Sequence, residues 1–130
     1  MADSGISHVE ILRTAAQVII NLHTAKPGLI IGRGGTAIEK LKEKLNKRFS
    51  DKFEVNIQEV RKPGLSAKLV AESIARQVEK RISYRRAAKM AIEKSMEAGA
   101  VGIKIFAAGR LNGVEIARSE FFSKGKIPLH

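Results

Sequence analysis

The chain has 130 residues, with 24 Lys or Arg against 13 Asp or Glu, so its formal net charge is +11. This excess favours a polyanionic partner, and a chain of this length forms one domain or two small ones. The absence of cysteine excludes disulfides and thiolate metal sites, and the longest apolar runs are far shorter than a membrane span.

The positive charge is concentrated in two segments. Residues 26–48 carry seven basic and two acidic side chains, and residues 76–94 also carry seven and two, so each has a net charge of +5. The rest of the chain is close to neutral. A positive electrostatic field is therefore expected around these two segments.

The first half of the chain predicts two strands, two helices and a third strand. Apolar and polar residues alternate over 9–11 and 18–22, the period of half-buried strands, with a turn expected near 13–16. Lys-Pro-Gly at 26–28 ends the second strand. A short apolar helix, a glycine turn and an amphipathic helix to about Lys47 then follow.

A third alternating segment at 53–57 predicts another strand, and Lys62-Pro63-Gly64 ends it. We place a domain boundary there, which gives domains at 6–62 and 63–130.

The second half predicts two helices followed by a β-hairpin. The apolar arcs of 67–78 and 84–98 are rotated relative to each other, so one straight helix could not bury both. We expect a break near Ile82-Ser83, with Ser83 as N-cap. A strand around 103–106, a turn at 111–113 and a return strand at 114–120 complete the prediction.

The most informative motif is Gly32-Arg33-Gly34-Gly35, which lies between the two expected helices of the first half. Glycines leave room for a nucleic-acid backbone, and the N–H groups of the following helix point at its phosphates. The order strand–strand–helix–helix–strand is that of the type II KH domain, whose Gly-x-x-Gly loop binds RNA backbone. Gly32, Arg33, Gly34, Gly35 and Lys40 are therefore candidate RNA-binding residues.

A dinucleotide-binding enzyme is the rival interpretation of the same glycines. Gly32-x-Gly34-x-x-Ala37 fits the Ala-terminated fingerprint, and Glu54 lies about twenty residues further on. That fingerprint requires a full strand before the first glycine, and Pro27-Gly28 leaves room for only three residues. We rank an enzyme third, behind two RNA-binding hypotheses.

Arg85, Arg86 and Lys89 form the second candidate RNA-binding cluster. At helical spacing they share one face, opposite an alanine-rich face. They could be an ordinary solvated helix surface with Glu93 as a partner. If the alanines pack, however, the three cations are held in place to contact phosphates without regard to base sequence.

The sequence offers no catalytic or metal-binding set. His8, His23 and His130 are scattered along the chain, and no nucleophile–base pair or carboxylate pair can be assembled from neighbouring positions. We interpret His23 as a packed or surface residue rather than a ligand. No cofactor and no metal are expected.

Motifs spread along the chain resemble the family of bacterial-type small-subunit ribosomal protein number three, which carries a type II KH domain. They lie at residues 20–35, 59–63, 67–72, 85–87, 102–104, 109–111, 115–118 and 127–130. The chain departs from the family at Phe121-Phe122, where the family has Trp-Tyr, and at Ala108, where it usually has Ser. We expect the chain to lack the family's leading and trailing segments.

The resemblance implies an α/β (α+β) chain: a type II KH domain, then a small domain of two helices and a β-hairpin. It implies a structural constituent of the small ribosomal subunit that binds ribosomal RNA and borders the mRNA entry channel. Positions matching Arg85, Arg86 and Lys89 line that channel in the family. The implied partners are ribosomal RNA, mRNA and neighbouring small-subunit proteins in the cytoplasm, with no membrane. The alternative is a free-standing KH regulator of RNA outside the ribosome.

Overall fold

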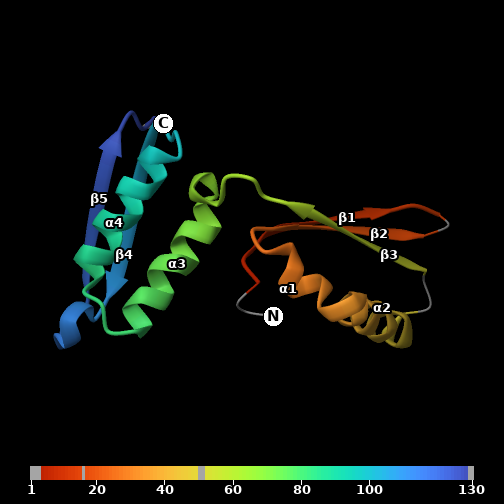
Figure 1. Ribbon diagram of the computed structural model, residues 1–130. Helices are drawn as coiled ribbons and strands as arrows, with labels where there is room; N and C mark the ends of the chain where they lie inside the picture. Colours follow the sequence, from red (N-terminus) through yellow and green to blue (C-terminus); the bar gives the residue numbers. More distant parts are fainter. Residues whose placement is uncertain (1–3, 16, 50–51, 129–130) are drawn as a thin grey trace. The chain divides into compact units, whose positions relative to one another are not determined.

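The computed structural model describes residues 4–15, 17–49 and 52–128. The chain divides into two compact units, residues 1–61 and 62–130, and Figure 1 shows the elements of each. The first unit contains, in order, β1 (Ile6–Arg13), β2 (Val18–Thr24), α1 (Pro27–Ile31), the short 3-10 helix η1 (Arg33–Gly35), α2 (Thr36–Arg48) and β3 (Phe53–Glu59).

The first unit is a three-stranded sheet with both α-helices on one face (Figure 1). The strand order is β1-β2-β3, with β2 antiparallel to β1 and parallel to β3. Leu22, Ile30 and Val55 are buried between sheet and helices. This order of elements confirms the predicted KH architecture. The predicted turn near 13–16 includes Ala16, which lies outside the described residues.

The opposite face of this sheet is mostly polar, with Leu12 and Ile19 as its paired apolar residues. Side chains alternate along a strand, so His23 and Asn21 face away from buried Leu22, their neighbour on β2. In Figure 1, neither labelled helix of this unit lies on that side.

The second unit consists of helices packed against a β-hairpin. Its elements are η2 (Pro63–Leu65), α3 (Ala67–Glu79), α4 (Tyr84–Glu97), β4 (Gly102–Gly109), η3 (Leu111–Gly113) and β5 (Arg118–Gly125). β4 and β5 pair antiparallel, and α4 packs against α3 and against both strands. Ala87, Ala88 and Ala91 are buried, so the alanine-rich face of α4 is the packed one, as predicted.

The break between the two helices falls where their apolar arcs diverge. α3 ends at Glu79 and α4 begins at Tyr84, and Arg81 between them has a φ of 63°. Ser83 occupies the N-cap position, but its side chain forms no capping hydrogen bond.

The predicted return strand was wrong in its position. It was expected at 114–120, whereas β5 runs from Arg118 to Gly125. Residues 114–117, which follow η3, form a loop instead, and the Nε of Arg110 donates to the carbonyl of Val114 at 2.9 Å. Ile116 is 80% exposed, so its side chain is not buried against the sheet.

Candidate nucleic-acid interface

The glycine turn joins α1 to α2 through three residues with positive φ. Gly32, Gly34 and Gly35 have φ angles of 72°, 61° and 79°, a region that residues with a Cβ rarely adopt. A Cβ on Gly32 would lie 2.8 Å from the Cβ of Ala37, whereas a Cβ on Gly34 or Gly35 would meet nothing within 4 Å. Gly32 is therefore required for packing and conformation, while Gly34 and Gly35 face open space.

The helix that follows the turn begins without a side-chain cap. Gly35 occupies the N-cap position of α2, and no side chain accepts a hydrogen bond there. The hydroxyl of Thr36 donates backward to the carbonyl of Arg33 at 3.1 Å instead. The positive end of a 13-residue helix therefore opens beside the glycines, as an anion-binding site requires.

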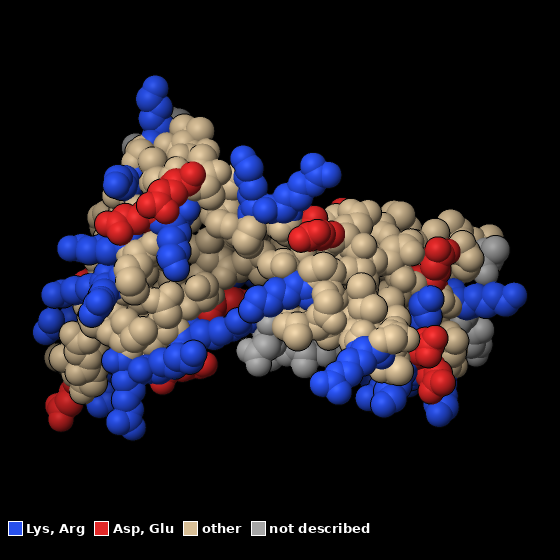
Figure 2. Space-filling view, in the orientation of Figure 1, with Lys and Arg blue, Asp and Glu red and all other residues tan. Residues whose placement is uncertain are grey.

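Two of the predicted cations lie around this turn. Arg33 is within it and Lys40 is on α2, and both side chains are exposed. Among the described residues, no carboxylate lies within ion-pair distance of either one. Figure 2 shows Lys and Arg side chains projecting from this unit into solvent. The turn thus combines open backbone, a helix N-terminus and unpaired positive charge.

The second cluster is arranged differently from the sequence-based expectation, because Arg85 is held by a carboxylate from β5. Its Nη2 donates to Oε1 of Glu120 at 2.8 Å and its Nε donates to Oε2 at 3.2 Å. The guanidinium carbon also lies 5.6 Å from the centre of the Tyr84 ring. A two-pronged bond of this kind matches the planar geometry of both groups.

The ion pair favours the charged form of both groups. The hydrogen bond from Arg85 holds the pKa of Glu120 below its ordinary value, and the same bond raises the pKa of Arg85 above its ordinary value. The carboxylate of Glu120 therefore largely compensates the charge of Arg85, and the two hydrogen bonds restrict the movement of its side chain toward a phosphate.

Arg86 and Lys89 are the two free cations of this cluster. Both are exposed, and within the described part of the chain no carboxylate pairs with them, Glu93 included. The buried alanines fix the helix from which they project. The structure thus holds Arg86 and Lys89 as one exposed pair and ties Arg85 to the sheet.

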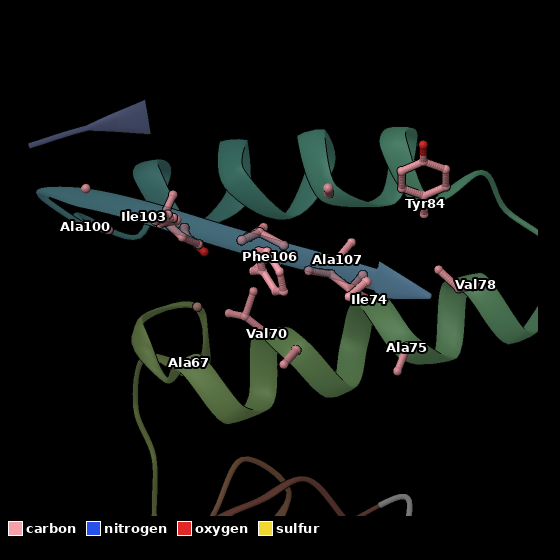
Figure 3. A pocket seen from close by; sticks show the side chains of 18 of the residues that line it. Ala67, Val70, Ile74, Ala75, Val78, Tyr84, Ala100, Ile103, Phe106 and Ala107 are labelled. Atoms are coloured by element: carbon pink, nitrogen blue, oxygen red, sulfur yellow. The ribbon is translucent and has the colours of Figure 1, made fainter. Parts of the chain in front are cut away.

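A groove of about 840 Å³ in the second unit does not suit a polyanion. It lies between α3 and β4, where Phe106 from the strand and Val70 and Ile74 from the helix border it (Figure 3). Most of its lining is apolar, and Phe106 is 65% exposed. Its chemistry fits apolar groups, not phosphate.

Sequence reasoning missed two relationships that depend on strand register. Glu120 lies 35 positions from Arg85 and meets it only because β5 runs beside α4. His8 and His23 are directly opposite each other on β1 and β2. The predicted turn near 13–16 implied that the first two strands pair, but only the register identifies which of their residues face each other.

Comparison with known proteins shows similarity along the whole chain. A KH-domain model matches residues 1–65, and a model described as the C-terminal domain of ribosomal protein S3 matches residues 74–130. No helix in the described part of the chain is long and apolar enough to cross a membrane.

Curated relatives are similar over the same span. The chain is 53% identical to small ribosomal subunit protein uS3 of Enterococcus faecalis over 130 residues. This aligned region is 100% of this chain and 60% of the relative. The chain is also 53% identical to the protein of that name from Ligilactobacillus salivarius, with the same coverage. The protein of that name from Syntrophomonas wolfei is 51% identical over 127 residues, which are 98% of this chain and 56% of the relative. The chain therefore spans about 60% of the length of the first two relatives.

Proposed function

Because the chain belongs to the family of small ribosomal subunit protein uS3, we propose that it is an RNA-binding constituent of the small ribosomal subunit. It binds ribosomal RNA and neighbouring small-subunit proteins, and it resides with the ribosome in the cytoplasm. It performs no bond-making chemistry and uses no cofactor.

The observation that carries this proposal is the open glycine turn beside the uncapped start of α2. Gly34 and Gly35 leave the backbone accessible, and Arg33 supplies an unpaired charge next to it. A sugar–phosphate strand that approaches here meets backbone N–H groups and a cation without steric obstruction. Lys40, one turn into α2, extends the same positive surface.

The second proposed RNA surface is the pair Arg86 and Lys89 on α4, with Arg85 as a positioned neighbour. We propose that this surface guides mRNA at the entry channel, as the family resemblance implies for these positions. Exposed cations on a rigidly packed helix contact phosphates irrespective of base identity. Binding without base specificity suits a surface that contacts mRNAs of every sequence.

Each unit is proposed to be a domain, with the boundary near Lys62 and Pro63. On this proposal the first domain contacts RNA through its glycine turn, and the second through α4.

Sedimentation of the chain in cell extracts tests the ribosomal assignment. The tagged chain should migrate with small subunits in a sucrose gradient, and it should remain there after ribonuclease treatment that removes free transcripts. Arg86→Glu combined with Lys89→Glu should reduce crosslinking of the bound chain to mRNA. The matched control is Lys124→Glu with Lys126→Glu, which makes the same charge change on exposed residues of the same unit and should leave crosslinking unchanged.

Two results would contradict the proposal. Sedimentation with free transcripts alone would favour the alternative, a KH regulator that acts outside the ribosome. Equal crosslinking by the α4 variant and its control would remove the role of Arg86 and Lys89 while leaving the ribosomal assignment intact.

A further inference from the structure

Strand register brings two histidines and a glutamate together on the polar face of the first unit. His8 on β1 pairs directly with His23 on β2. Glu10 lies two residues beyond His8 and therefore points to the same side of the sheet. The two imidazole rings are stacked, with their centres 3.9 Å apart and 12° between their planes.

The three side chains converge through atoms that can bind a metal. The Nε2 of His8 lies 3.6 Å from Oε1 of Glu10, and the Nε2 of His23 lies 3.6 Å from Oε2 of the same carboxylate. One ligand atom from each residue falls within 4.8 Å of the other two. Both distances of 3.6 Å exceed a good hydrogen bond, so the three groups face one another without being bonded.

The Nε2 of His23 is the second, independent sign of a missing ligand. This atom is buried, and it has no hydrogen-bond partner among the described residues. A buried polar atom without a partner costs free energy, and native proteins rarely leave one unexplained. A cation between His23 and Glu10 would satisfy it.

We propose that His8, Glu10 and His23 bind one divalent first-row transition-metal ion, with Zn²⁺ as the expected ion. Two imidazoles and one carboxylate are an established ligand set for such ions, and water would occupy the fourth position. Mg²⁺ and Ca²⁺ prefer oxygen ligands, so a site with two nitrogens discriminates against them. The site binds an ion; it is not assigned a catalytic role.

The exposed fractions of the three side chains suit a site in which one ligand stays in place and two can rotate. The side chain of His23 is 18% exposed, whereas those of His8 and Glu10 are 54% and 51% exposed. Zinc bonds of about 2.0–2.2 Å at tetrahedral angles place ligand atoms roughly 3.3–3.6 Å apart, close to the two separations of 3.6 Å. The stacked rings direct their Nε2 lone pairs in nearly parallel planes, so the ring of His8 must rotate out of the stack for both imidazoles to bind one ion. Side-chain rotation of the two exposed residues can supply this movement while His23 stays in place.

A neighbouring hydroxyl can orient one of the imidazoles. The Nδ1 of His8 lies 3.4 Å from the Oγ of Ser7. A proton on Nδ1 directed at this oxygen leaves the lone pair on Nε2, the atom that faces Glu10. Partners of this kind commonly select the metal-binding tautomer of histidine.

The site is separate from the proposed RNA contacts. α1 and α2, which flank the glycine turn, lie on the other face of the sheet (Figure 1). Metal binding would instead join β1 to β2 through their side chains. Because β1 is an edge strand of this sheet, the expected consequence is a more stable first unit in the presence of the ion.

Calorimetric titration of the untagged full chain with zinc chloride tests the proposal, with magnesium chloride as the ion control. We expect one Zn²⁺ per chain and no saturable heat with Mg²⁺. His8→Ala and Glu10→Gln should each weaken Zn²⁺ binding by at least about tenfold. Both residues are exposed, so these variants should retain the far-UV circular dichroism of the parent. His23→Ala is a third ligand variant, and it should also weaken Zn²⁺ binding. Because His23 is largely buried, this variant is compared with the parent only if its circular dichroism is native.

The matched control is His130→Ala, which removes the remaining histidine of the sequence and should leave the Zn²⁺ affinity unchanged. Absence of saturable Zn²⁺ binding by the parent chain would overturn the proposal. It would also be overturned if His8→Ala and Glu10→Gln, both folded, bound Zn²⁺ as tightly as the parent, or if His130→Ala lost binding to the same degree as they did.

Discussion

Arg85 and Glu120 form a two-pronged ion pair that ties the first turn of α4 to β5. The two hydrogen bonds measure 2.8 and 3.2 Å, and Tyr84 lies beneath the guanidinium. Both groups are near the surface, so the pair is accessible to solvent and salt. It divides a cluster of three cations, the proposed RNA surface on α4, into one compensated member and two that have no carboxylate partner among the described residues.

This division predicts unequal effects of two arginine substitutions. Arg86→Gln should weaken binding to single-stranded RNA more than Arg85→Gln, since Arg85 already has a carboxylate partner. The salt dependence should separate them further, because each phosphate contact contributes about −0.7 to the log–log slope. Fluorescence anisotropy with a labelled oligonucleotide at several salt concentrations measures both quantities.

The control for this comparison is Glu120→Gln, which removes the negative charge that faces Arg85 and leaves the arginine in the sequence. RNA affinity should rise and the slope should become steeper, because one more cation is available. Equal losses for Arg85→Gln and Arg86→Gln, with no gain in the control, would mean that the ion pair opens freely when RNA binds.

The same pair predicts a pH-dependent contribution to stability. The folded-state pKa of Glu120 lies below its ordinary value of 4.5 because Arg85 binds the ionised form. A depressed carboxylate pKa stabilises the fold above the unfolded pKa, and this contribution is lost as the pH falls through the folded value. Arg85 stays charged throughout the acidic range, so it adds no dependence there.

Urea denaturation of the parent and of Glu120→Gln measures this contribution. The parent should be the more stable chain at neutral pH, and the difference between the two midpoints should shrink as the pH falls below the ordinary carboxylate value of 4.5. A difference that stays constant across this range would show that Glu120 acts through packing and not through its charge.

The fold was largely predictable because its signals are local. Alternating apolar residues indicated β1, β2 and β3, and the rotation between two apolar arcs indicated the break before Tyr84. The return strand was misplaced because it was expected to follow the turn at 111–113 directly, whereas residues 114–117 precede β5 and Ile116 among them is largely exposed. Hairpin connections vary in length, so a turn motif alone does not determine the residue at which the return strand begins.

The candidate site was only half predictable, for a related reason. Gly32, Gly34 and Arg33 are neighbours in sequence, so the turn could be recognised from the sequence. Partners such as Glu120 for Arg85 depend on how distant strands align, and periodicity does not determine that alignment. RNA contact at either place stays a prediction.

Acidic side chains in the glycine turn should abolish its contact with RNA. Arg33→Asp combined with Gly34→Asp places two negative charges where phosphate is expected to lie. Gly34 has room for a side chain, and Asp tolerates positive φ better than most residues, so the fold should persist. The matched neutral control is Arg33→Asn with Gly34→Asn, which has the same shape without the negative charge.

RNA affinity should fall much further in the Asp variant than in the Asn control, as measured by the same anisotropy assay, while circular dichroism stays native in both. If the Asp variant binds as well as the parent chain, the turn has only a structural role.

The two glycines should differ in what an alanine does to stability. Gly32→Ala combines a φ of 72° with a Cβ 2.8 Å from that of Ala37, so it adds a clash to the conformational strain. Gly34→Ala meets no atom within 4 Å and carries the strain alone. We expect about 1–2 kcal/mol of destabilisation for Gly34→Ala and a further 1–3 kcal/mol for Gly32→Ala. Chemical denaturation measures both, and equal losses would contradict the packing role of Gly32.

Thr24 is fully buried and its hydroxyl connects three segments of the first unit. Its Oγ1 donates to the carbonyl of Ser4 at 2.6 Å and accepts from the N–H of Lys26 at 3.1 Å. Thr24→Val keeps the shape but removes these bonds and a longer one of 3.3 Å to the carbonyl of Gly5, which should destabilise the chain by about 1–3 kcal/mol. Thr24→Ser is the matched control, because it retains the hydroxyl and loses one methyl group. Any loss of stability caused by the cavity left by that methyl group occurs only in this variant. Urea denaturation of both variants separates the two contributions. If Thr24→Ser were the less stable of the two, packing of the methyl group would matter more than the hydroxyl, and the end of β2 would be held mainly by apolar contact.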